Sequence, residues 1–285
     1  MKLISRIALL ASAAVLLPVG AAMAADYDPP IVVDEAPEYV PVEIGSGWYL
    51  RGDVGYIFKA RIGQVDYRTY DGFNYGNAAF DTQSIGTDFS WGGGVGYRFN
   101  EWIRADATVE GFRASFAGTT SSATPCIDPL VDPLYLGTTC RSEDSSEFSA
   151  IGVMANGYVD LGTFVGLTPY VGAGIGYSYV SWGGLHNQTY CVDGGGVCPQ
   201  AGVIATSEHA GDNNWRLTYA LMAGFAYDIN DYLKVDLGYK YRHVAGGGMF
   251  HWDAATAGLG ATGIQGTDGG FDTHEVKLGL RYELW

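Results

Sequence analysis

The stretch from Val171 to Tyr177 reads VGAGIGY, and the spacing of Gly172, Gly174 and Gly176 could place backbone amides around a phosphate. A dinucleotide-binding fingerprint needs its third glycine at position 177, where this chain has a tyrosine, and it needs a helix after the loop. The following residues, SYVSWGG, are poor helix formers, and the preceding GLTPY is not a continuous apolar run. We therefore assign these glycines to a strand.

If the chain forms strands, as its residue alternation described below predicts, an enzyme would need a nucleophile and a base placed together on one strand face. His274 and Glu275 are neighbours on a predicted strand, where adjacent side chains point to opposite faces. None of the histidines is two residues from a serine on a predicted strand face. The histidines are His186, His209, His243, His251 and His274. The sequence therefore predicts a protein that is not an enzyme.

The sequence also predicts no metal and no cofactor. The carboxylates Asp253, Asp268 and Asp272 lack the regular spacing of a calcium loop, so we interpret them as solvated loop charges. Zinc binding is not favoured, because the cysteines include no CxxC knuckle.

Cysteines occur in two local pairs, Cys126 with Cys140 and Cys191 with Cys198. Four cysteines allow three pairings, and each local pair brackets a short polar segment that contains glycine or proline. Because an exported chain meets an oxidising compartment, we expect disulfides and favour the two local ones.

The N-terminus has the features of a secretory signal peptide. Residues 1–24 contain Lys2 and Arg6 ahead of an apolar run, and we expect cleavage between Ala24 and Ala25. Residues 25–46 follow as an acidic periplasmic tether, since 25–45 combine four prolines with six acidic residues. The formal net charge of −15 argues against a nucleic-acid partner, because a phosphate backbone requires a basic face.

Residues 47–285 alternate with a period of two, which predicts strands. In the clearest case, Trp215 to Ile229, every second residue from Trp215 is apolar and those between are mostly small or polar. The predicted strands are Trp48–Phe58, Phe89–Phe99, Ile103–Phe116, Phe148–Leu161, Pro169–Trp182, Trp215–Ile229, Leu233–Arg242 and Phe271–Leu284. We predict an all-β fold, an eight-stranded antiparallel up-and-down transmembrane β-barrel.

The connections between these strands alternate in length. Asn100-Glu101 and Asn230-Asp231 read as two-residue turns and 162–168 as a modest one, whereas the links near 60–88, 117–146, 183–213 and 246–270 run to some 25 or 30 residues. Short periplasmic turns opposite long outer loops are typical of outer-membrane barrels.

Aromatic residues are predicted to form two girdles at the strand ends. The girdle beside the short turns contains Trp48, Phe99, Trp102, Tyr158, Tyr170, Tyr227, Tyr232 and Tyr282, and the girdle beside the long loops contains Trp91, Trp182, Trp215 and Phe271.

Charged residues on the opposite phase of the strands are predicted to face the lumen. They are Arg51, Asp53, Arg98, Arg104, Asp106, Glu110, Arg216, Asp228, Lys234, Asp236, Lys240, Arg242, Glu275, Lys277 and Arg281. Because buried charges must pair, we expect a neutralised, hydrogen-bonded plug, with a narrow polar pore as the alternative. Inward glycines such as Gly172 and Gly92 would leave room for the long side chains of other strands and ease curvature.

The segments GSGWYLRGDVGY, GGVGYRF, GAGIGYSY and GLRYEL resemble small outer-membrane β-barrel proteins of the porin and opacity-protein type from Gram-negative bacteria. The resemblance covers essentially the whole mature chain. It implies an eight-stranded barrel in the cell outer membrane, inserted by the barrel assembly machinery that reads the last strand. In that family an aromatic residue closes the chain in phase with the lipid-facing residues, whereas Trp285 lies one residue beyond the phase of Val276 to Leu284.

The expected function is structural. A closed barrel would contact outer-membrane lipid and lipopolysaccharide and contribute to envelope integrity. A narrow passive diffusion channel is one alternative, and an adhesin or receptor that binds surface ligands through its outer loops is another.

Overall fold

The computed structural model of the chain describes residues 47–86, 88–122, 126, 138–192 and 203–284. The predicted signal peptide, its cleavage site at Ala24 and Ala25, the tether and Trp285 lie outside the described residues. In the part of the chain that is described, no helix combines the length and the apolarity needed to cross a membrane.

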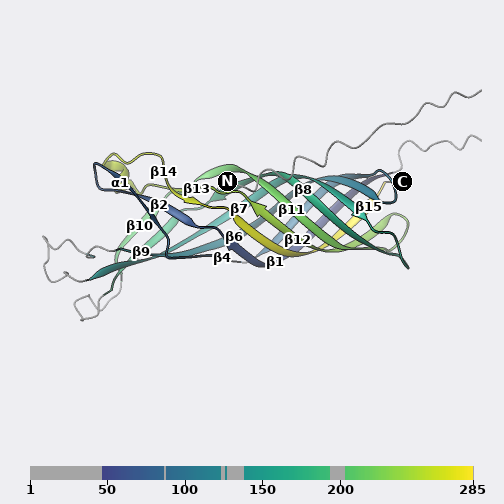
Figure 1. Cartoon of the computed structure of the whole chain (residues 1–285), viewed down its shortest axis with the longest axis horizontal. Coiled ribbons are helices and arrows are strands. Elements are labelled where there is room, and N and C mark those ends of the chain that lie inside the picture. Colours follow the sequence, from purple (N-terminus) through teal and green to yellow (C-terminus); the bar gives the residue numbers. More distant parts are fainter. Residues whose placement is uncertain (1–46, 87, 123–125, 127–137, 193–202, 285) are drawn as a thin grey trace, which may run out of the picture. The chain divides into compact units, whose positions relative to one another are not determined.

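Long antiparallel strands form a closed ring (Figure 1). The ring consists of β1 (Trp48–Ile62), β5 (Phe89–Arg98), β6 (Ile103–Ser121), β7 (Thr139–Asp160), β8 (Leu167–Trp182), β11 (Asn213–Asp228), β12 (Leu233–Val244) and β15 (Phe271–Glu283). Each strand pairs with the next, and β1 closes the ring by pairing with both β5 and β15. The predicted all-β barrel is confirmed, and these pairings place eight strands in the ring.

The short connections at one end use local hydrogen bonds. The Asn100 side chain accepts from the amides of Trp102 and Ile103, both at 2.8 Å, and Asn230 does the same for the amides after it. Such Asx turns reverse the chain without help from other strands. The third connection is less regular, because Val165 has a φ of 51°, in the left-handed region that β-branched residues avoid.

The long connections at the other end contain secondary structure that the sequence analysis assigned to loops. The elements are β2 (Val65–Tyr70), β3 (Tyr75–Ala79), β4 (Thr82–Ile85), β9 (Leu185–Val192), β10 (Val203–His209), β13 (Gly247–His251), α1 (Ala254–Gly258) and β14 (Ile264–Asp268). Strands β13, β14, β2 and β3 form a separate four-stranded sheet, which we call the loop sheet. Strand β4 pairs with β6, and β9 pairs with β7 and β10.

The link between β6 and β7 is shorter than predicted, because both strands continue beyond their apolar parts. Their pairing runs without interruption from Ile103↔Val159 to Ser121↔Arg141. The added residues are mostly small or polar on both faces, so they carry no period-two hydropathy signal. Backbone pairing between β6 and β7, together with the pairing of β4 and β9 to these strands, extends the hairpin beyond its apolar part.

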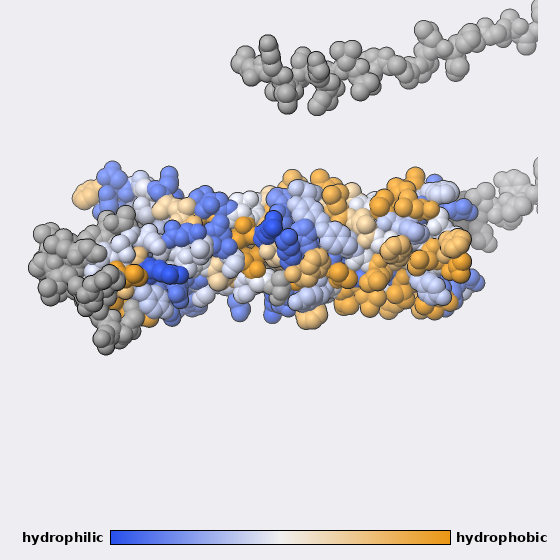
Figure 2. Space-filling view, turned by 60° about the horizontal axis from the view of Figure 1, so that its bottom comes forward, coloured by the Kyte–Doolittle hydropathy of each residue, from blue (hydrophilic) through white to orange (hydrophobic). Residues whose placement is uncertain are grey.

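The outward and inward faces follow the predicted alternation. On β11, Trp215 is 62% exposed, whereas Arg216 and Thr218 are 3% and 0% exposed. Hydrophobic residues gather over the half of the barrel that carries the short turns, and hydrophilic residues gather toward the loop sheet (Figure 2). This is the surface expected where a barrel meets lipid over part of its length.

The girdle prediction is wrong for four aromatic residues. Tyr158, Tyr170, Trp182 and Phe271 are buried inside the barrel. Each lies on the inward phase of its strand, and position along the strand does not change the face to which a side chain points. The remaining predicted girdle residues lie on the outside, among them Trp91, which is 54% exposed.

Candidate functional site: the barrel interior

Paired charges line the interior next to the short turns, around a pocket of about 420 Å³, and we call them the lower layer. It consists of Arg98, Arg104, Asp160, Asp228, Lys234, Asp236, Arg281 and Glu283. Arg104 Nε lies 3.1 Å from Asp160 Oδ1, and Arg281 Nη2 lies 3.3 Å from Asp236 Oδ1. Every member of the layer therefore has a partner of opposite sign on a different strand.

Tyrosine rings cover the guanidinium groups of this layer. The Arg104 guanidinium lies 4.1 Å from the Tyr158 ring centroid and 4.8 Å from that of Tyr170, and Arg281 lies 5.5 Å from Tyr49. Cation–π contacts of this kind replace part of the hydration that a buried guanidinium loses.

Arg51 connects the strands in the middle of the barrel. It donates from Nη2 to Asp53 Oδ1 at 2.8 Å, and from Nη1 to Asp106 Oδ2 and Tyr158 Oη, both at 2.7 Å. Asp106 also accepts from Asn156 Nδ2 at 2.7 Å. One arginine thus ties β1 to β6 and β7 through charge-assisted hydrogen bonds, which are stronger than neutral ones.

Glu110 is the centre of the next group of charges. Its carboxylate accepts from Lys240 Nζ, from Arg242 Nη2 at 2.7 Å and from Lys277 Nζ at 3.5 Å. Arg242 also lies 3.7 Å from Glu275 Oε2. The Glu110 side chain is 6% exposed, so this carboxylate balances three cations from β12 and β15 with little help from solvent.

An apolar layer lies beyond Glu110, toward the loop sheet, and the sequence analysis missed it. Phe148 contacts Trp182 with ring centroids 4.4 Å apart and Phe271 at 5.3 Å, and Phe112 lies 6.1 Å from Phe271. Val65, Phe80, Ile85, Leu185, Met249 and Phe250 from the outer connections belong to the same buried cluster. Arg242 lies 5.2 Å from the Phe112 ring, so this layer directly adjoins the charges. The sequence could have indicated this layer, because Phe112 is two residues from Glu110 on the same strand and therefore points to the same inward face.

The inward glycines accommodate different neighbours from those we expected. A Cβ on Gly172 would lie 2.5 Å from Tyr158 Cδ1, and one on Gly96 would collide with the ring of Tyr49. Gly174 makes room for Asn156, and a Cβ on Gly92 would lie 3.3 Å from Glu110 Cγ. The space is taken mainly by side chains and backbone of adjacent strands rather than by long arginine and lysine side chains.

All the charged residues assigned to the lumen by the sequence lie on inward positions, but they do not form one network. Arg216 is separate from the others, because its Nη1 donates to both carboxylate oxygens of Asp268 in the loop sheet, at 2.8 and 2.7 Å. Sequence reasoning omitted Asp160, Asp268 and Glu283. Asp160 was recognisable from its phase with Tyr158, whereas nothing local in the sequence indicates that Asp268 meets Arg216.

The loop carboxylates are not uniformly solvated. Asp268 is 5% exposed, and its burial raises the pKa of the carboxyl group although Arg216 opposes that change. Asp253 caps α1 by accepting from the amides of Ala255 and Thr256. Partial burial alone would raise the pKa of Asp253, and these hydrogen bonds lower it.

The cysteine prediction is confirmed for one pair. Cys126 and Cys140 form a disulfide with Cα atoms 4.6 Å apart, which ties Cys126 to the start of β7. Cys191 is also disulfide-bonded and lies opposite Cys140 on β9. Cys198, the partner we expected for Cys191, lies outside the described residues.

One statement about the histidines needs correction, because residues 203–209 form a strand. Ser207 and His209 are two residues apart on β10, and Ser207 Oγ lies 3.1 Å from His209 Nε2. His209 Nδ1 lies 3.2 Å from the carbonyl oxygen of His251, so the ring links β10 to β13. Across the described ranges, no group of three or more His, Cys, Asp or Glu side chains is arranged to hold a metal ion.

An antiparallel ring with an apolar outer face, a charged interior and short turns at one end defines the class of outer-membrane β-barrel proteins. The family model described as outer membrane protein beta-barrel domain matches residues 12–283, and the chain belongs to this family. The protein is therefore located in the cell outer membrane.

Relatives of known sequence are similar over nearly the whole chain. An uncharacterised protein of Brucella abortus is 39% identical over 93% of this chain and 94% of its own length. A candidate adhesin of Rickettsia bellii is 26% identical over 84% of this chain and 89% of its own length. Among solved structures, the outer membrane protein OprG from Pseudomonas aeruginosa has a TM-score of 0.40 and 14% identity, covering 84% of this chain and 96% of its own.

Proposed function

We propose that the protein is a non-enzymatic structural component of the outer membrane, with a closed lumen, that contributes to envelope integrity. The observation that carries this proposal is the two-part filling of the interior. Paired charges occupy the half near the short turns, and the apolar layer around Phe148 lies beyond them. An ion would have to displace both parts in order to pass.

The two parts oppose permeation for different reasons. Charges in a low-dielectric interior are costly to separate once they are paired, because each partner would be left uncompensated. Aromatic and aliphatic side chains offer no hydrogen bonds to water or to a hydrated ion, and hydrophobic constrictions exclude water. Together they favour a closed barrel over the alternative of a passive channel.

Conductance in planar bilayers tests this proposal. The mature protein is expected to give no steady unitary conductance at any applied voltage. A conducting outer-membrane porin, inserted under the same conditions, shows that insertion and detection work. Steady, reproducible conductance of the unaltered protein would overturn the closed-barrel proposal and favour the passive channel.

Contribution to the envelope is tested separately in cells. Deletion of the protein should increase uptake of a dye or antibiotic that an intact outer membrane excludes, and the unaltered chain should reverse this effect. Unchanged permeability on deletion would contradict the structural role.

A surface-binding role is a second candidate, because the outer connections form a structured sheet and the Rickettsia bellii relative is named as a candidate adhesin. Phe73, at the tip between β2 and β3, is 92% exposed, so its ring is accessible to a binding partner. Replacing Phe73 with serine should reduce attachment to host cells, and replacing the exposed Leu259 serves as a control. Equal attachment by all three proteins would contradict this role.

A further inference from the structure

The outward face of β12, β15 and β1 changes abruptly from apolar to charged residues. Tyr56 and Val276 lie opposite each other as the last apolar pair of β1 and β15. The bulge after Ile57 then places Lys59 opposite His274, and Arg61 opposite Asp272. His243 of β12 lies opposite Asp272. We call Lys59, Arg61, His243, Asp272 and His274 the rim cluster.

The rim cluster lies at the edge of the lipid-facing band. From Trp48 to Phe58 the outward residues of β1 are almost all apolar, and ten strand residues advance about 33 Å. With the usual tilt of 35–45°, that length covers about 25 Å along the membrane normal, the height of an outer-membrane apolar band. The next outward residues, Lys59 and Arg61, are thus at the level of the lipid headgroups on the side of the long loops.

Aromatic and acidic side chains hold the histidines of the rim cluster in place. Asp272 Oδ1 accepts from Tyr241 Oη at 2.8 Å and lies 2.7 Å from His243 Nδ1. The Tyr219 ring stacks on His243 at 4.9 Å, and Tyr239 Oη lies 2.6 Å from His274 Nδ1.

The lysine and the arginine of the rim cluster are free to bind an anion. Lys59 and Arg61 are exposed and, among the residues that the structure describes, have no ion pair within 4.0 Å. Asp272 is engaged by His243 and Tyr241, so the cluster has a surplus of positive charge.

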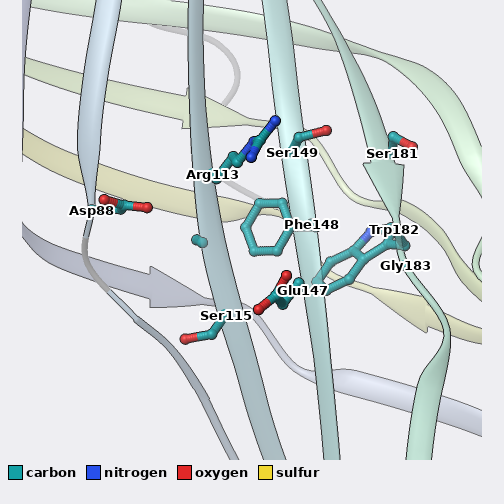
Figure 3. A pocket seen from close by; sticks show the side chains of 10 residues that line it. Asp88, Arg113, Ser115, Glu147, Phe148, Ser149, Ser181, Trp182 and Gly183 are labelled. Carbon is teal, nitrogen blue, oxygen red and sulfur yellow. The ribbon is translucent and has the colours of Figure 1, made fainter.

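On the barrel face made by β6, β7 and β8, the outer end of the apolar band carries a different balance of charges from the rim cluster. Arg113 there shares a pocket of about 590 Å³ with Asp88, Glu147, Ser149 and Ser181 (Figure 3). Two carboxylates line that pocket with one guanidinium, so it does not favour an anion. Within the described ranges, Arg113 also lacks an ion pair within 4.0 Å, but two carboxylates line its pocket, whereas the rim cluster brings two cations together with one carboxylate that is engaged by His243 and Tyr241.

We propose that the rim cluster binds the phosphate groups of lipopolysaccharide in the outer leaflet, with Lys59 and Arg61 as the contacts. The acyl chains of the same molecule would lie along Tyr56, Val276 and their apolar neighbours. A phosphorylated amphiphile matches both the charge of the cluster and its position at the headgroup level. The inference does not depend on whether the lumen conducts.

The test uses the full mature barrel refolded in phosphatidylcholine vesicles, with and without lipopolysaccharide. Lipopolysaccharide should raise the temperature at which the folded form is lost in heat-dependent gel mobility. The double variant Lys59→Gln with Arg61→Gln should bind it about twenty-five-fold more weakly, because two surface cations each contribute about fivefold. Arg113→Gln, a matched exposed arginine, should behave like the unaltered protein.

Each control has an outcome that counts against the proposal. Equal weakening by Arg113→Gln would show general charge attraction instead of a site. Enzymatically dephosphorylated lipopolysaccharide should fail to stabilise the protein, and full stabilisation by it would overturn phosphate recognition. Stabilisation of the same size by phosphatidylglycerol would overturn the assignment to lipopolysaccharide. Folding of each variant in phosphatidylcholine alone is checked first, and the single variants replace the double one if it does not fold.

Discussion

At the residue scale, Glu110 is the side chain on which most of the interior charge balance depends. It is a single carboxylate in contact with Lys240, Arg242 and Lys277, and it is joined to the Arg51 group because Lys277 also lies 3.6 Å from Asp53. Such a group favours one arrangement of strands β6, β12 and β15, since any other would leave cations unpaired in the barrel.

Replacing Glu110 with glutamine should therefore destabilise the barrel by about 3–5 kcal/mol, the usual cost of removing one partner from a buried ion pair. Urea unfolding in lipid vesicles, followed by tryptophan fluorescence, measures this change. Glu143→Gln on the exposed part of β7 is the matched control and should change the free energy of unfolding by less than about 0.5 kcal/mol. Similar small effects for both variants would mean that water compensates the three cations.

The glycines that first suggested a phosphate site give a second prediction. A Cβ on Gly176 would collide with the Val153 carbonyl and lie 2.8 Å from Met154 Cα, which are backbone atoms that cannot rotate away. Gly176→Ala should cost about 1–3 kcal/mol, the range for overpacking. Gly157→Ala has no atom within 4 Å of the added Cβ and should be neutral in the same unfolding assay. A neutral Gly176→Ala would show that these glycines are not required for close strand packing.

At the element scale, the turn between β7 and β8 carries backbone strain. Val165 is 84% exposed and adopts a φ of 51°, so its side chain gains no packing that would offset the left-handed conformation. Val165→Gly should raise the free energy of unfolding by about 1 kcal/mol, because the left-handed region costs an L-residue roughly 1–2 kcal/mol. Val159→Gly, in a regular strand, should lower it. A loss of stability from both substitutions would show that Val165 is not strained.

The strands themselves were predictable, because period-two hydropathy over a lipid-facing band is imposed by the membrane. The outer extensions of β6 and β7 were not, since mostly small or polar residues on both faces leave no alternation to read. The bulge after Ile57 was not either, because it is a shift in register against β15 within the apolar run from Tyr56 to Phe58. The charged members of the interior could be found from phase alone. Their partners could not, because register between strands decides which of them meet.

At the scale of the whole molecule, Arg216 and Asp268 connect the barrel to the loop sheet. Their side chains are 1% and 0% exposed, Arg216 Nη2 also donates to the Gly248 carbonyl at 2.6 Å, and Asp268 accepts from the Gly270 amide at 2.9 Å. The pair joins β11 to both β13 and β14. The outer sheet is thus held by a contact inside the mouth of the barrel as well as by the chain connections.

Replacing Asp268 with asparagine leaves Arg216 buried without its counter-ion, so we expect the loop sheet to detach locally while the membrane-spanning ring stays folded. The ring keeps its own ion pairs and its backbone pairing, and local unfolding draws on the least stable contacts first. Protease should cleave the outer connections of Asp268→Asn at least tenfold faster, with unchanged heat-dependent gel mobility of the barrel. Asp66→Asn, an exposed position on β2 of the same sheet, is the control. Unchanged cleavage would show that the apolar layer beneath the sheet holds it without the ion pair, and a loss of the folded barrel would show that sheet and ring unfold as one unit.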